Sequence, residues 1–205
     1  MKRPKMPAMI AAACAALHPM LAQAHHAMDG ALPGTVFEGL LSGLGHPVIG
    51  LDHLVFVLAM GAACYYFGRR VIGIGAFLVA ALIGTTLHVQ QATLLYAELW
   101  VAASLVLLGI AVLWASPALR GIAVPIFFAA AGVVHGYAYG ESIVGAEQAP
   151  LLAYLVGFTV IQAAIALTAF ALARHADRTH RSAAALRTVG GIASVAGVAF
   201  LLMAL

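Results

Sequence analysis

The chain has 205 residues, of which 64% are hydrophobic and only 8% are charged. Soluble domains carry about a quarter charged residues, so this composition excludes a water-soluble globule and indicates a membrane protein. The formal net charge is +3, but the basic residues lie in short clusters between apolar runs. That distribution marks membrane topology and argues against a nucleic-acid partner. The 2 cysteines form no CxxC pair, which excludes a disulfide framework and a cysteine metal site of that kind.

The first residues have the pattern of a signal peptide. Three of the first five are basic, the apolar run 9–17 follows, and the small residues Ala22 and Ala24 flank Gln23. This order predicts a signal peptide over residues 1–24, cleaved after Ala24, and a single transmembrane domain over residues 25–205. An uncleaved anchor helix is the alternative interpretation.

Six apolar segments follow, each close to the roughly 20 residues that a helix needs to cross a membrane. No alternating strand pattern indicates a barrel. We therefore predict an all-α fold, a polytopic membrane helical bundle with about six transmembrane helices and many small residues at the helix contacts. The predicted spans are Val48–Phe67, Val71–His88, Leu99–Ala115, Ile122–Tyr139, Leu151–Ala173 and Val189–Leu205.

The arginines define an orientation. After residue 24, every arginine lies in one of the segments 68–70, 116–121 and 174–188, which alternate with arginine-free connections. Positive residues stay on the cytoplasmic side, so we expect these segments to face the cytoplasm. The sequence thus predicts a protein of the bacterial inner membrane, multi-pass, with the mature N-terminus and the C-terminus both periplasmic.

Polar residues at membrane depth are costly and need a reason. The densest group is the stretch from His46 to His53, which includes Asp52. In a straight helix the two histidines would lie on one face about 10 Å apart, too far to bind one ion. Pro47 and Gly50 can break the helix and let His46 fold back over Asp52 and His53. Imidazole with carboxylate suits borderline divalent metals, whereas an Asp52–His53 pair or a helix cap is the structural alternative.

A second stretch on the predicted fourth span carries His135 and Glu141, with glycines between them. Taken alone, a histidine that bonds to a neighbouring helix explains it as well as a metal ligand does. It lies at the same predicted depth and side as the first stretch, however. Together the two stretches predict one site of nitrogen and oxygen ligands: His46, Asp52, His53, His135 and Glu141.

Four further residues are weaker candidates for metal contact. His25 and His26 follow the predicted cleavage site, where they can capture metal first or have no role. His88 ends the second span and suits an interfacial position equally well. Glu98 starts the third span, where a carboxylate is favoured by the helix dipole in any case.

These motifs resemble those of the HupE/UreJ family of nickel/cobalt permeases. The match rests on the pattern His46-Pro-x-x-Gly-x-Asp52-His53 with Leu58 to Gly61 after it, and on the run from Phe128 through His135 to Glu141. A further pattern joins Glu98, Ser104 and Gly109. The chain departs from the family in Tyr137 and Tyr139, where members often carry histidine, and in the bulky Val55-Phe56-Val57.

The resemblance implies secondary uptake of Ni²⁺ or Co²⁺ for metalloenzymes such as hydrogenase or urease, or for cobalamin synthesis. It implies metal roles for His46, Asp52, His53, His135 and Glu141. We expect no enzymatic activity, because HExxH and GxSxG motifs are absent from the sequence. We also expect no tightly bound cofactor, with the metal ion and the lipid bilayer as partners. The alternatives are a membrane metal-binding accessory or sensor subunit without transport, and a haem-binding membrane protein.

Overall fold

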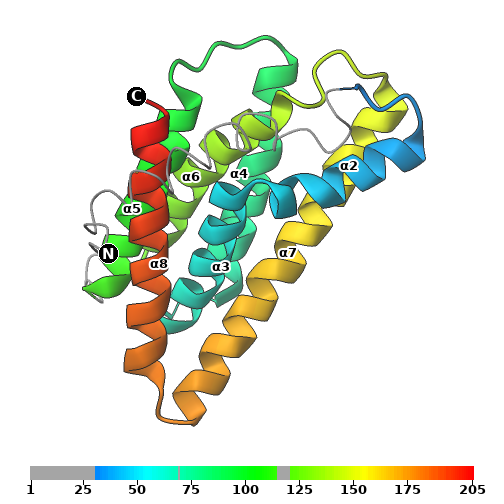
Figure 1. Cartoon of the computed structure of the whole chain (residues 1–205). Coiled ribbons are helices and arrows are strands. Elements are labelled where there is room, and N and C mark those ends of the chain that lie inside the picture. Colours follow the sequence, from blue (N-terminus) through cyan, green and yellow to red (C-terminus); the bar gives the residue numbers. More distant parts are fainter. Residues whose placement is uncertain (1–30, 69, 115–120) are drawn as a thin grey trace, which may run out of the picture.

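The computed structural model describes residues 31–68, 70–114 and 121–205, and these contain seven helices and no strand (Figure 1). The all-α prediction is confirmed. The predicted signal peptide, with His25 and His26, lies outside the described residues. The helices are α2 (Val36–Ile49), α3 (Leu51–Tyr66), α4 (Arg70–Val89), α5 (Ala97–Leu113), α6 (Ala123–Gly140), α7 (Gln148–Arg178) and α8 (Ser182–Met203).

Five of the six predicted spans each fall on one of these helices, and the first is divided between α2 and α3. Four of them, α4, α6, α7 and α8, are long and apolar enough to cross a membrane alone. Helices α2 and α3 reach that length only as a pair bent by 76°. Helix α5 has 17 residues and is about 25 Å long, slightly short of the roughly 30 Å hydrocarbon core. The described chain is therefore a helical membrane bundle with four or five full-length candidate spans.

Two boundaries differ from the sequence prediction. The span predicted over Val48–Phe67 is broken, because α2 ends at Ile49 and α3 begins at Leu51. The segment before it, which lies outside the six predicted spans, is helical from Val36. Thr35 starts that helix with a capping box: its side chain accepts the Glu38 amide, and the Glu38 carboxylate accepts the Thr35 amide. This reciprocal pair satisfies two backbone amides that a helix start otherwise leaves unpaired. The prediction of spans from apolar runs did not consider such polar helix starts.

The predicted polar loop over 174–188 is also mostly helical. Helix α7 continues to Arg178 and α8 starts at Ser182, so only three residues form the turn. Tyr65 and Ser182 both donate hydrogen bonds to the carboxylate of Asp177, at 2.7 and 2.6 Å. These bonds tie the α7–α8 hairpin to the end of α3.

Glycines hold the helix pairs close together. A Cβ atom on Gly84 or Gly136 would overlap backbone atoms of the facing helix in the α4–α6 pair. Gly43 meets the backbone of α7 in the same way, and Gly109 meets that of α8. The predicted role of small residues in packing is confirmed at these positions.

The connections gather at two ends of the bundle (Figure 1). The α3–α4 turn and the α7–α8 hairpin lie at one end, and the α4–α5 and α6–α7 connections lie at the other with the C-terminus. This arrangement places the hairpin arginines opposite Glu98, Glu141 and Glu147, as the alternating topology requires.

Candidate metal site

The break between α2 and α3 brings two histidines together. Pro47 lies in the last turn of α2, and Gly50 has an extended backbone (φ −70°, ψ 97°) that redirects the chain. The ring centroids of His46 and His53 are 5.9 Å apart, and each residue is only 2% exposed. The fold-back predicted from Pro47 and Gly50 is confirmed. Gly50 has no room for a Cβ atom, which would lie 2.7 Å from the His53 ring.

His135 of α6 completes a group of three buried histidines. Its Nδ1 lies 2.9 Å from the Nδ1 of His53, and the residue is fully buried. One nitrogen donates a proton to the other, since a hydrogen bond between two ring nitrogens needs one N–H and one lone pair. Two motifs that are 82 residues apart in the chain thus meet at the junction of α3 and α6.

Ser104 of α5 sets the protonation pattern of His135. The Ser104 hydroxyl donates to the Val101 carbonyl at 2.7 Å, so its oxygen accepts a hydrogen bond from Nε2 of His135 at 3.0 Å. Neutral His135 therefore carries its proton on Nε2 and turns the Nδ1 lone pair toward His53. A hydrogen bond that fixes the far nitrogen is the usual support of a histidine that binds metal.

His46 is held by a similar arrangement of hydroxyl groups. Its Nδ1 lies 3.0 Å from Ser142 Oγ and 3.2 Å from Tyr154 Oη. Both hydroxyls can donate to the Tyr139 carbonyl, at 3.1 and 2.8 Å. Ser142 Oγ can also donate to Tyr154 Oη at 3.1 Å, so these groups form one hydrogen-bond network around His46 Nδ1.

The ring of Tyr139 packs against two of the histidines. Its centroid is 5.0 Å from that of His46 and 4.4 Å from that of His53. The Tyr139 hydroxyl donates to Gln162 Oε1 at 3.2 Å, and Gln162 is fully buried in α7. Tyr139 therefore forms one wall of the site with its aromatic ring.

Aromatic residues close the site on another side. The ring of His135 lies 4.3 Å from Phe56 and 5.8 Å from Phe77, centroid to centroid. Both phenylalanines are fully buried and belong to the apolar core around α3. The group of histidines thus has hydroxyl groups on one flank and hydrocarbon on the other.

Asp52 supplies the negative charge nearest the histidines. Its carboxylate accepts the backbone amide of His53 at 2.8 Å and lies 3.9 Å from His53 Nε2. The side chain is 14% exposed. Within residues 31–68, 70–114 and 121–205, no three His, Cys, Asp or Glu side chains already converge on one point as a formed metal site. His53 and His135 instead bond to each other, and His135 and His46 bond to hydroxyl groups.

The other predicted ligands lie farther out. Glu141 is exposed at the end of α6, and its neighbour Ser142 is the residue that contacts His46. His88 stacks on Tyr137 and donates from Nδ1 to the Tyr137 carbonyl at 2.6 Å. Glu98 is exposed in the first turn of α5, as its helix-dipole interpretation requires. Metal binding by these residues stays a prediction.

Sequence reasoning missed Ser142, Tyr154 and Gln162, and it noted Ser104 only as part of a family pattern. All four are buried; Ser104, Tyr154 and Gln162 lie in apolar helices, and Ser142 lies in the turn after α6. The signal that could have found them is the free-energy cost of placing a polar side chain at membrane depth. That cost applies to hydroxyl and amide groups as well as to charged groups.

A family model described as HupE / UreJ protein matches residues 12–200, nearly the whole chain. No curated protein and no solved structure gives a match. The matched region includes both histidine motifs, the broken α2–α3 pair and all of the remaining helices except the last residues of α8. The chain belongs to the HupE/UreJ family.

Proposed function

We propose that this membrane protein is a permease that takes up a divalent transition metal ion, Ni²⁺ or Co²⁺, through the site at His46, Asp52, His53 and His135. The observation that carries the proposal is the direct contact of His53 with His135 inside a membrane bundle. Three imidazoles buried together are expensive in a bilayer and bind borderline divalent metals well.

The spacing of the two facing nitrogens suits a shared ion. With metal–nitrogen bonds of about 2.0–2.1 Å and bond angles of about 90–110°, two ligand nitrogens lie about 2.8–3.4 Å apart. The Nδ1 atoms of His53 and His135 are 2.9 Å apart. A metal ion bound to both nitrogens would lie to one side of the line that joins them, so the shared proton has to leave and both rings have to turn toward the ion.

The surroundings support binding of a cation. Asp52 provides a carboxylate beside His53, which offsets part of the ion's charge. Ser104 keeps the Nδ1 lone pair of His135 directed toward His53. The apolar floor formed by Phe56 and Phe77 means that release toward the other side requires these helices to move or water to enter.

The test is uptake of radioactive nickel and cobalt by proteoliposomes that contain the full chain. His53→Ala and His135→Ala are expected to lower uptake at least tenfold, and Asp52→Ala to abolish it, with insertion unchanged. The control is His175→Ala, which removes an exposed histidine at the opposite end of the bundle. Normal uptake by His53→Ala and His135→Ala would exclude this site.

The same preparation separates the alternatives. An accessory or sensor subunit would bind the metal with the same histidine dependence but would not carry it into the vesicles. A haem protein would be coloured after purification. Direct contact of the His53 and His135 rings disfavours haem, because a porphyrin plane has to lie between two axial histidines.

A further inference from the structure

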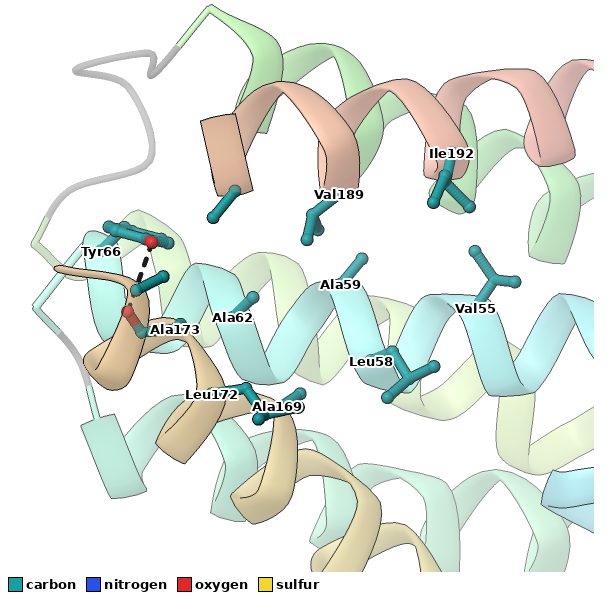
Figure 2. Close-up of a pocket in the computed structure, with 12 residues that line it drawn as sticks. Val55, Leu58, Ala59, Ala62, Tyr66, Ala169, Leu172, Ala173, Val189 and Ile192 are labelled. Atoms are coloured by element: carbon teal, nitrogen blue, oxygen red, sulfur yellow. Dashed lines mark hydrogen bonds between the residues drawn. The ribbon is translucent and has the colours of Figure 1, made fainter. Parts of the chain in front are cut away.

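An apolar pocket lies on the flank of α3 that faces α7 and α8. It has a volume of about 390 Å³ and is bounded by α3, α7 and α8 (Figure 2). Tyr66 and Ala59 of α3, Ala173 of α7 and Val189 of α8 belong to its lining. The Tyr66 hydroxyl is bonded to the Ala173 carbonyl at 3.3 Å, so the walls present mainly hydrocarbon.

The pocket exists because two helices diverge. Helices α7 and α8 meet at their three-residue turn and separate with distance from it (Figure 1). Helix α3 forms the floor between them, and its residues Val55, Ala59, Ala62 and Tyr66 line the pocket along one face. At the rim, Leu58, Leu172 and Ile192 are 39%, 63% and 56% exposed, so the pocket opens sideways toward the bilayer.

The dimensions fit a hydrocarbon chain better than a protein helix. The lining runs from Val55 to Tyr66, about 16 Å along α3. Even the whole open space of about 910 Å³ in and around the pocket, divided by that length, gives a cross-section below about 60 Å². A helix with its side chains is about 10–12 Å across and fills about 80–110 Å². A second copy of the chain could therefore not insert a helix here without spreading α7 from α8.

Positive charge marks the closed end of the pocket. The hairpin over residues 174–187 holds four arginines and one aspartate, a net charge of +3 with the histidines neutral. Arg181 directly precedes α8, and its backbone bonds to two residues that line the pocket: its carbonyl accepts the Ala185 amide, and its amide donates to the Ala176 carbonyl. It is exposed, and Asp177 nearby is engaged by Tyr65 and Ser182.

We propose that this pocket holds one acyl chain of an anionic phospholipid, whose headgroup lies on Arg181 and the neighbouring arginines of the α7–α8 hairpin. Apolar burial holds the chain, at about 0.8 kcal/mol per methylene. Basic groups beside a gap between transmembrane helices supply the preference for anionic headgroups.

The experiment is native mass spectrometry of the full chain after reconstitution in vesicles of equal parts phosphatidylglycerol and phosphatidylethanolamine. One phosphatidylglycerol per chain is expected to survive detergent removal of the bulk lipid. Ala185→Leu, and separately Ala176→Leu, should fill the pocket and abolish retention. Their control is Ala183→Leu, on the opposite face of α8.

A second pair of variants tests the headgroup contact. Arg181→Gln is expected to lower the preference for phosphatidylglycerol over phosphatidylethanolamine about fivefold, the effect of about 1 kcal/mol per arginine. Arg187→Gln removes the same charge from another face of α8 and should change the preference much less. Two results would overturn the proposal: unchanged lipid retention in both pocket-filling variants, or a dimer that Ala185→Leu converts to monomers.

Discussion

The histidines show how a few hydroxyl groups determine the chemistry of a buried site. Ser104 directs the lone pair of His135 toward His53, and the Ser142 and Tyr154 hydroxyls hold His46 by its Nδ1 atom. The sequence predicted the histidines and the role of Gly50 in bringing two of them together. It could not predict the hydroxyl partners, because they come from α5, α7 and the turn after α6, and no local pattern joins them to the motif.

Removal of the Ser104 hydroxyl should weaken metal binding without disrupting the fold. In Ser104→Ala, His135 loses the acceptor that fixes its proton on Nε2, and loss of such supporting contacts lowers metal affinity about 10–100-fold. Calorimetric titration of the purified protein with Ni²⁺ measures the change.

The control is Ser194→Ala. Ser194 Oγ is buried without a hydrogen-bond partner among the described residues, so its removal should leave nickel affinity unchanged. Equal affinities in the two serine variants would contradict the positioning role of Ser104.

At the scale of helices, glycine placement decides which faces meet. The sequence indicated packing by small residues, but it could not separate the glycines that touch another helix from those that do not. Gly73 and Gly190 lie against side chains or backbone of other helices, whereas Cβ atoms on Gly75 and Gly191 would have nothing within 4 Å. Only the three-dimensional pairing of α4 with α6 and of α5 with α8 makes that distinction.

Helix α4 offers a matched pair of substitutions that tests this packing. Gly84→Ala puts a Cβ atom against the Val133 carbonyl of α6 and should cost about 1–3 kcal/mol of folding free energy. Gly75→Ala has open space and should be neutral or stabilising by up to about 1 kcal/mol. Melting temperatures in detergent compare the two, and a Gly84→Ala protein as stable as Gly75→Ala would disprove the close α4–α6 contact.

At the scale of the whole molecule, charge separates the two ends of the bundle. The hairpin arginines lie at one end, and Glu147 with the α6–α7 connection lies at the other (Figure 1). Positive loops are retained in the cytoplasm. We therefore propose that the hairpin is cytoplasmic and that the metal site is reached from the periplasmic side.

Cysteine labelling of intact cells tests this orientation. Glu147→Cys and Thr179→Cys are both exposed positions, one at each end of α7. A membrane-impermeant maleimide should label Glu147→Cys directly and Thr179→Cys only after the membrane is permeabilised. The reverse pattern would show that the bundle is inverted, with the site open to the cytoplasm.

The sequence by itself determined the helical membrane class, the positions of the six apolar segments and the two histidine motifs. Those features depend on local composition, and a bilayer imposes the same length and polarity on every spanning helix. The tertiary structure decided what composition cannot: the additional helix α2 against α7, the contact of His53 with His135, and the pocket between α7 and α8. Each depends on which helices lie side by side, and that arrangement follows from steric fit between distant segments, not from any one segment's own sequence.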